Sequence, residues 1–162
     1  MSIDRKSAFL RTVCVFICVS IFCVKLHAQQ KDELKSMIDS AINSRYNQFK
    51  LATRTSNKSY FENLYLINEE DQSFNHLISS NRFKSINIYD SKNKKVLKKG
   101  IYAWKVFTIL EKNQLIVNIV SFFITYKNHN YNFANGGGSN EIFEYNCSKG
   151  VWKLVSSENY GN

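Results

Sequence analysis

Residues 101–126 form two apolar runs, IYAWKVFTIL (101–110) and LIVNIVSFFITY (115–126), on either side of the polar break EKNQ. Apolar side chains with a period of two around a four-residue break predict a β-hairpin. Both faces of the first run are apolar, with Tyr102, Trp104, Val106 and Leu110 on one face and Ile101, Ala103, Phe107 and Ile109 on the other. A sheet with one wet face alternates apolar with polar residues. We therefore expect a helix to cover one face, and a further layer, a subunit or a ligand to cover the other.

The best candidate for the covering helix is residues 31–50. Apolar residues recur there at three- and four-residue steps: Leu34, Met37, Ile38, Ala41, Ile42, Tyr46 and Phe49. This spacing predicts an amphipathic helix of about five turns. A helix of this length needs an apolar surface to dock against.

The rest of the chain predicts short elements on either side of this hairpin. They are a strand at Phe61–Ile67, a short helix at 69–79 capped by Asn68, a strand at Ser85–Tyr89, a lysine-rich turn at Asp90–Gly100, a flexible glycine-containing loop at Tyr131–Asn140, and a closing hairpin of Glu141–Cys147 with Val151–Ser156. Helices first and strands afterwards is typical of the α+β class. We predict a long N-terminal amphipathic helix and a short second helix packed on a curved antiparallel β-meander.

The N-terminus has the three-part layout of a secretory signal peptide. Arg5, Lys6 and Arg11 precede an unbroken run of low polarity, Val13–Val24, and a short polar region ends at Ala28. A membrane anchor is the alternative, but twelve residues span about 18 Å, short of the roughly 30 Å hydrocarbon core. We predict that residues 1–28 are removed, and that residues 29–162 form a single α+β domain, exported to the periplasm or secreted.

Cysteine usage agrees with this reading. Cys14, Cys18 and Cys23 lie in the predicted signal, and none follows the small residues that lipid attachment requires. Removal of the signal leaves Cys147 alone, so that no disulfide within the chain can form. A small exported domain of this kind depends on its apolar core or on a partner for stability.

A long helix, a short helix and an antiparallel meander that closes with the hairpin FEYNCSKGVWKLV (143–155) resemble the cone-shaped cystatin-like and ketosteroid-isomerase-like α+β folds. The closing hairpin is also similar to that of small uncharacterised exported bacterial proteins. The resemblance spans most of residues 31–157. It implies a cavity between helix and sheet, and often a dimer across the outer face of the sheet. It implies no isomerase chemistry, because a fold does not fix a function, and no catalytic residue is carried over.

The motifs of common enzymes and metal sites are not found. Gly136-Gly137-Gly138 lacks the Lys-Ser/Thr of a phosphate loop, and His76, His129 and Cys147 have no paired spacing for zinc. The three acids at 69–71 offer no regular spacing of metal ligands. We predict neither a cofactor nor a metal.

Five lysines lie within eight residues: Lys92, Lys94, Lys95, Lys98 and Lys99. Such a run could bind nucleic acid, anionic headgroups or an acidic glycan, or form a solvated turn that protects a sheet edge. Export argues against nucleic acid as the partner, and contact with the membrane is expected only through the signal peptide.

The function that we predict is a non-catalytic binding or protein-interaction domain, with a small apolar ligand or a protein as partner and a homodimer as a further option. Aromatic side chains give a large contact area with few rotatable bonds. Four of them are the expected binding residues: Tyr102, Trp104, Phe122 and Tyr126.

Two other functions stay open. One is a small envelope enzyme of the isomerase or dehydratase type, which needs a carboxylate or histidine of shifted pKa in a cavity between helix and sheet. Glu144, Asp90 and His129 are its candidate residues. The other is an immunity or inhibitor protein that blocks the active site of a partner.

Overall fold

The computed structural model describes residues 32–51, 63–74 and 82–161. The chain separates into two units, Met1–Ser36 and Met37–Asn162. Of the first unit the structure describes residues 32–36, which are helical. The predicted signal peptide, 1–28, lies outside the described residues.

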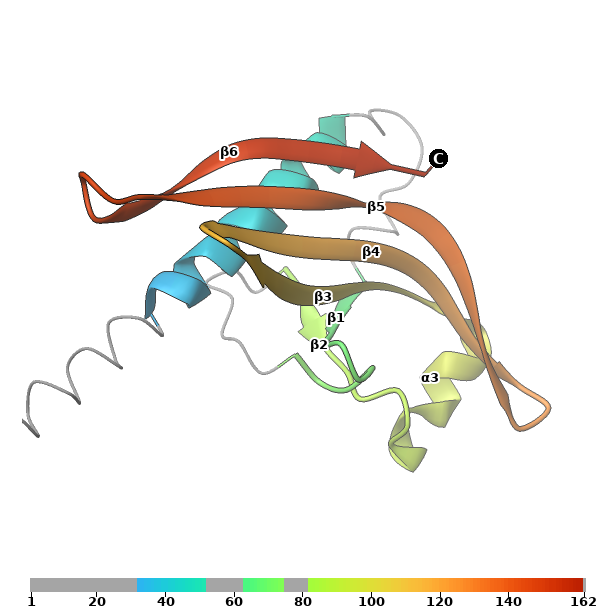
Figure 1. Ribbon diagram of the computed structural model, residues 1–162. Coiled ribbons are helices and arrows are strands. Elements are labelled where there is room, and N and C mark those ends of the chain that lie inside the picture. The colour runs from blue at the N-terminus through green and yellow to red at the C-terminus, as the bar shows by residue number, and fades with distance from the viewer. Residues whose placement is uncertain (1–31, 52–62, 75–81, 162) are drawn as a thin grey trace, which may run out of the picture. The chain divides into compact units, whose positions relative to one another are not determined.

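The second unit contains a curved, open sheet of six strands in the order β2-β1-β3-β4-β5-β6 (Figure 1). Its strands are β1 (Leu64–Ile67), β2 (Lys84–Ser85), β3 (Ile101–Glu111), β4 (Gln114–Lys127), β5 (Asn130–Asn146) and β6 (Val151–Tyr160). Strands β3 to β6 run antiparallel to one another in sequence, whereas β1 runs parallel to both β2 and β3. The predicted α+β fold, with two helices packed on a mostly antiparallel sheet, is confirmed.

The central hairpin lies where the alternation of apolar residues predicts it. Strands β3 and β4 pair without interruption from Ile101↔Ile124 to Glu111↔Gln114. The turn is shorter than the predicted break, because Glu111 and Gln114 pair with each other and leave two residues between them. The first of these, Lys112, has a φ of 55°, as a two-residue hairpin turn that matches the twist of the strands requires.

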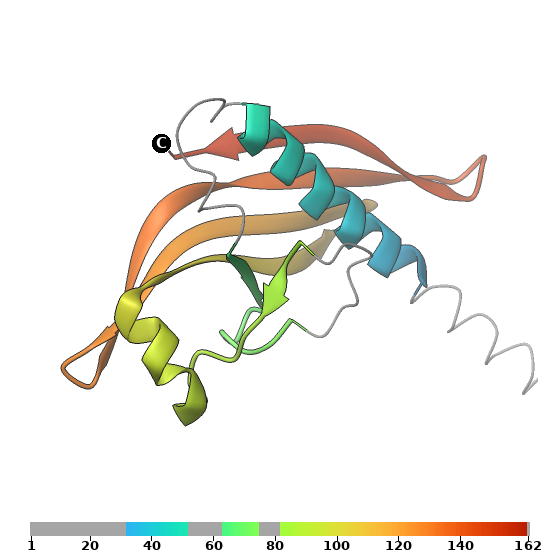
Figure 2. The ribbon, with the colours of Figure 1, turned by 180° about the vertical axis from the view of Figure 1, so that it is seen from behind.

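One face of the sheet, here called the helix face, carries Trp104, Ile119 and Ser139 and is covered by residues 37–51 of a helix that spans 32–51 (Figure 2). Ala41 and Ile42 of this helix are fully buried. Side-chain hydrogen bonds join the helix to β6: Arg45 Nη1 donates to Asn159 Oδ1, and Gln48 Nε2 donates to Ser157 Oγ at 2.9 Å. The predicted amphipathic helix is therefore present, and its apolar side meets the predicted hairpin.

The other face of the sheet, here called the opposite face, is covered at one end by α3 (Lys94–Lys99) and the segment before it. Leu97 of α3 is fully buried in a cluster with Ile67, Ile86, Ile88, Ile101, Ala103, Ile124 and Tyr126. At the far end of the hairpin, Ile109 is 41% exposed on this face. The chain itself thus supplies part of the further layer that the two-sided hairpin requires.

The short helix predicted at 69–79 is wrong for residues 69–74, and residues 75–79 lie outside the described part of the chain. Residues 68–72 form a turn instead, in which Gln72 N donates to Asn68 Oδ1 at 2.7 Å and Asp71 has a φ of 60°. Asparagine and aspartate side chains that bond to nearby backbone groups compete with helix formation. In addition, Asp71 forms an ion pair of 2.6 Å with Lys105 of β3.

Three other local predictions are corrected. The lysine-rich turn contains a 3-10 helix, Ser91–Asn93, followed by α3. The loop predicted at 131–140 is part of β5, where a bulge opposite Ser121 absorbs two of its glycines. Of the strand predicted at Ser85–Tyr89, only Ser85 lies in a strand, β2, and Ile86 and Ile88 beyond it are buried in the cluster under α3.

Candidate functional site

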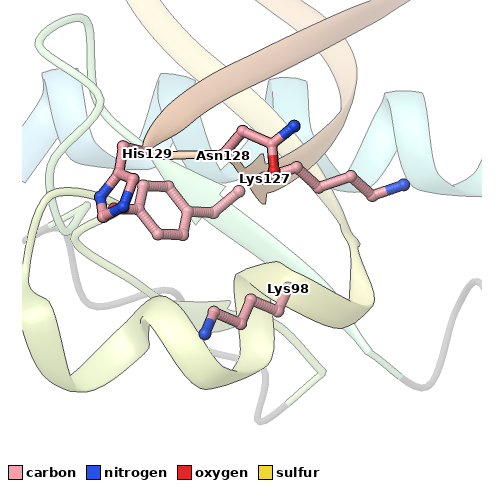
Figure 3. A pocket seen from close by; sticks show the side chains of 5 residues that line it. Lys98, Lys127, Asn128 and His129 are labelled. Atoms are coloured by element: carbon pink, nitrogen blue, oxygen red, sulfur yellow. The ribbon is translucent and has the colours of Figure 1, made fainter.

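A recess of about 560 Å³ opens between α3 and the turn that joins β4 to β5 (Figure 3). Its lining residues are Lys98 from α3, Tyr126 and Lys127 from β4, and Asn128 and His129 from the turn. We call it the basic recess. Figure 3 shows Lys98 and His129 on two sides of the gap, with the Lys127 side chain directed away from Lys98.

The turn is fixed by its backbone. Asn128 and His129 both have positive φ, 50° and 64°, which is the conformation of a two-residue hairpin turn. Asparagine and histidine are among the side chains that enter this region more readily than most. The turn therefore presents both polar side chains at the tip of the hairpin, at the mouth of the basic recess.

α3 is held in place at the other side of the recess. Leu97 anchors it in the core, and Gly100 ends it with a φ of 85° and an N–H bond of 3.1 Å to Leu97 O. A β-carbon at Gly100 would lie 2.3 Å from Cζ of Phe123, so the ring occupies the space that this glycine leaves open. The last turn of the helix, which carries the exposed Lys98, is thereby held against β4.

The basic recess is cationic. Within residues 32–51, 63–74 and 82–161, neither Lys98 nor Lys127 forms an ion pair, whereas Lys92 is paired with Asp90 at 2.9 Å. Lys94 adds a further charge, with its Nζ 5.2 Å from the centre of the Tyr126 ring. Because none of the described residues that line it is acidic, the recess would attract an anion.

A row of tyrosines backs the recess. The Tyr126 ring lies 4.8 Å from that of Tyr131, which in turn lies 5.3 Å from that of Tyr89. The Tyr89 hydroxyl donates to Asp71 Oδ2 at 3.3 Å. Burial, followed by the nearby Asp71 carboxylate, raises the pKa of Tyr89 above 10, so this hydroxyl keeps its proton at neutral pH. Tyr126, the tyrosine that lines the recess, is thus connected through Tyr131 and Tyr89 to Asp71 in the loop after β1.

The four predicted binding residues do not form one site. Tyr102 and Trp104 lie on the helix face, where Tyr102 is 42% exposed beside Phe123 and Trp104 is fully buried. Phe122 and Tyr126 lie on the opposite face, Phe122 against Phe133 and Tyr126 against Tyr131. Of the four, only Tyr126 lines the basic recess.

The three candidate residues of the enzyme hypothesis also lie apart. Asp90 caps the 3-10 helix by accepting from Lys92 N at 3.1 Å. Glu144 accepts from Asn113 Nδ2 at 2.8 Å at the far end of the hairpin. Of the three, only His129 belongs to the basic recess, and no carboxylate lies beside it among the described residues of the lining.

Among the described residues, the structure adds a buried carboxyl group that the sequence interpretation did not single out. Glu141 of β5 is fully buried on the helix face, where its Oε1 accepts from Ser157 Oγ at 2.8 Å and Arg45 lies nearby. Burial raises the pKa of this carboxyl group above its ordinary value of 4.5, although Ser157, Ser44 and Arg45 partly oppose the shift. The sequence could have indicated this burial, because Glu141 lies two residues before the apolar Phe143 in a predicted strand and therefore on the same face.

We expect Glu141→Gln to change how stability depends on pH. Because the pKa is higher in the folded than in the unfolded chain, the folded state binds more protons between the two values, and stability of the natural chain falls as pH rises through that interval. The variant has no such proton to lose, so its melting temperature should fall less steeply from pH 4 to pH 7. Thermal unfolding followed by circular dichroism at several pH values measures this.

Glu144→Gln is the matched control, since Glu144 lies on the same strand but is partly exposed on the opposite face. It should leave the pH profile close to that of the natural chain. If the melting temperatures of Glu141→Gln and of the natural chain change equally with pH, Glu141 is not the cause of the pH dependence.

In comparisons with known proteins, no family model, no curated protein and no solved structure matches the chain. Among the described residues, no group of three or more histidine, cysteine, aspartate or glutamate side chains could hold a metal ion. Within the same ranges, no helix has both the length and the apolar character needed to cross a membrane.

Proposed function

We propose that the chain is a non-catalytic binding domain whose basic recess receives the oxyanion, phosphate or sulfate, of a small ligand. One observation carries this proposal: Lys98 and His129 face a common gap of about 560 Å³ beside an aromatic ring, and no acid is among the described residues that line it. The Tyr126 ring offers the rest of the ligand an apolar contact. The ligand that fits is therefore small, with an apolar body and a tetrahedral anionic group.

The charges favour such a ligand. Two lysines without ion pairs within the described ranges line the recess, and the formal net charge of the chain is +9, of which residues 29–162 carry +6. An open cationic surface attracts anions at long range, and this attraction weakens as salt screens it. Binding to the basic recess should accordingly be weaker at high ionic strength.

Export of the chain remains part of the proposal. The N-terminal pattern of Arg5, Lys6, Arg11 and the apolar run to Val24 supports it. Outside the cytoplasm, phosphorylated or sulfated small molecules are available as ligands, whereas nucleic acid is not the expected partner. The mass of the chain purified from its host would show whether residues 1–28 have been removed.

Charge reversal in the basic recess tests the binding site. Lys98→Glu replaces a cation by an anion at the wall formed by α3, and we expect it to raise the dissociation constant for phenyl phosphate roughly tenfold. Isothermal titration calorimetry with phenyl phosphate, and separately with phenyl sulfate, measures the change and distinguishes the two sources of the oxyanion. Natural binding should weaken between low and high salt.

Lys112→Glu is the matched control, because it makes the same change of charge on the exposed β3–β4 turn, outside the lining of the recess. It should alter the affinity far less. If the natural chain binds neither probe, or if both variants weaken binding equally, the recess is not the binding site.

A further inference from the structure

The sheet ends in a long edge strand. β6 is last in the strand order, and among the described residues its outer side pairs with no other strand. The opposite edge, β2, has only two residues, whereas β6 has ten. A long edge strand exposes a row of backbone N–H and C=O groups that can pair with another chain.

The exposed side chains of β6 add to this. Three large apolar residues of the strand are strongly exposed: Val151 at 50%, Val155 at 49% and Tyr160 at 38%. Two exposed charges of opposite sign, Lys153 and Glu158, lie between the ends of the strand. Charged side chains, lysine in particular, usually keep an edge strand from pairing with another chain. Here the two charges are of opposite sign, so a second copy can offer each of them an attractive partner.

A bulge places both charges on one face. Leu154 pairs with Phe143 and Ser156 pairs with Ile142, which leaves Val155 as the extra residue. Lys153 pairs with Glu144 and Glu158 with Asn140, and both of these β5 residues lie on the opposite face. In a regular strand, residues five apart point to different faces, so it is the bulge that brings Lys153 and Glu158 to the same face.

We propose that β6 pairs antiparallel with β6 of a second copy of this chain, about a two-fold axis between Val155 and Ser156. Pairing of the whole strand from Val151 to Tyr160 has its centre at this point. It sets Lys153 opposite Glu158 of the second copy, and by symmetry Glu158 opposite Lys153. The surface is therefore complementary to itself, as a two-fold interface requires.

The apolar residues match in the same register. Val151 comes opposite Tyr160 of the second copy, also twice, and Val155 comes opposite Ser156 of the second copy, so that the two Val155 side chains lie diagonally across the axis. Because of the bulge, the residues that face each other across this pairing lie on the same face of the sheet. Trp152 and Leu154 lie on the helix face, and so do their counterparts in the second copy, Asn159 and Ser157. The pairing thus covers all three exposed apolar residues of β6 and joins two sheets into one.

A cycle of charge reversals tests this pairing. Lys153→Glu and Glu158→Lys each set like charges opposite each other twice, and each should raise the dissociation constant of the dimer about tenfold. The double variant restores opposite charges and should return the dissociation constant close to that of the natural chain. Sedimentation velocity over a range of concentrations, on protein purified after expression of the full chain, measures the constants.

Two further variants complete the design. Val155→Lys places two like charges beside the axis and should leave a monomer, whereas Lys95→Glu on α3 should leave the dimer unchanged. All of the altered side chains are exposed, and circular dichroism confirms that each variant is folded. A natural chain that is monomeric at its highest soluble concentration overturns the proposal. So does a dimer that resists the single reversals, or a double variant that is no tighter than they are.

Discussion

Replacing Trp104 with alanine is expected to lower the free energy of unfolding by about 3–5 kcal/mol. Trp104 is fully buried on the helix face of β3, and its ring lies 5.9 Å from that of Phe83. The Phe83 ring lies a further 5.6 Å from that of Tyr46, on the covering helix. Removal of the indole therefore leaves a cavity between sheet and helix and breaks this aromatic row. Urea denaturation followed by tryptophan fluorescence of Trp152 and by circular dichroism measures the loss.

Tyr102→Ala gives the comparison. Tyr102 lies two residues earlier on the same face of β3, but it is 42% exposed. Its truncation removes less buried surface and should cost about 1 kcal/mol. If Trp104→Ala costs no more than Tyr102→Ala, the core does not depend on the indole, and Trp104 becomes available again for the binding role predicted from the sequence.

Gly138→Ala is expected to destabilise the fold by about 1–3 kcal/mol, because β4 and β5 approach too closely there for a side chain. A β-carbon at this position would lie 2.5 Å from the backbone oxygen of Ile119 and 2.6 Å from the hydroxyl oxygen of Tyr160. The tyrosine can move, but the carbonyl belongs to the neighbouring strand, so the sheet itself must shift. Thermal and urea unfolding of the variant measure the effect.

Gly136→Ala is a close control, only two residues away. A β-carbon there would meet its nearest neighbour, Cβ of Ser121, at an ordinary distance of 3.6 Å, and its φ is not positive. This variant should be as stable as the natural chain, or slightly more stable, since alanine restricts the unfolded state. Equal losses at both positions would show that general stiffening of the bulge, and not the close approach at Gly138, is responsible.

The periodicity of long segments was sufficient to predict the main elements. The apolar alternation of 101–126 predicted the central hairpin, and the apolar residues of 31–50 predicted the covering helix, because each pattern extends over many residues. The two-sided character of the hairpin also predicted a further layer. That layer is partly α3, and no local pattern shows it, since a helix of six residues is too short to display a period.

The failures have a common physical cause: contacts distant in sequence override local preference. Asn68 and three acids resemble the start of a helix, but Asp71 pairs with Lys105 in β3 and the segment turns. The glycines at 136–138 resemble a loose loop, yet they lie in β5 because Gly138 allows the close approach of β4 and Tyr160. Neither contact is visible in the local sequence.

The sequence indicated some residues of the candidate site, but not that they lie together. The lysine run and Tyr126 were both singled out, the first as a basic patch and the second as a binding aromatic. Their meeting depends on α3 packing through Leu97 against the end of β4, which also brings His129 into reach. Lys127 and Asn128 had no signal of their own beyond their position after an apolar strand, where a turn is expected.

The parallel pairing of β1 has a consequence for synthesis of the chain. Leu64, Leu66 and Ile67 are buried between neighbours in the finished sheet, but β1 can pair with β3 only after residues 101–111 have left the ribosome. Until then the only neighbour that β1 has in the described sheet is β2, which is two residues long, whereas β3 to β6 are joined by short turns and can pair as they emerge. The interval in which the nascent chain is most open to wrong associations is thus set by the stretch between residues 67 and 101.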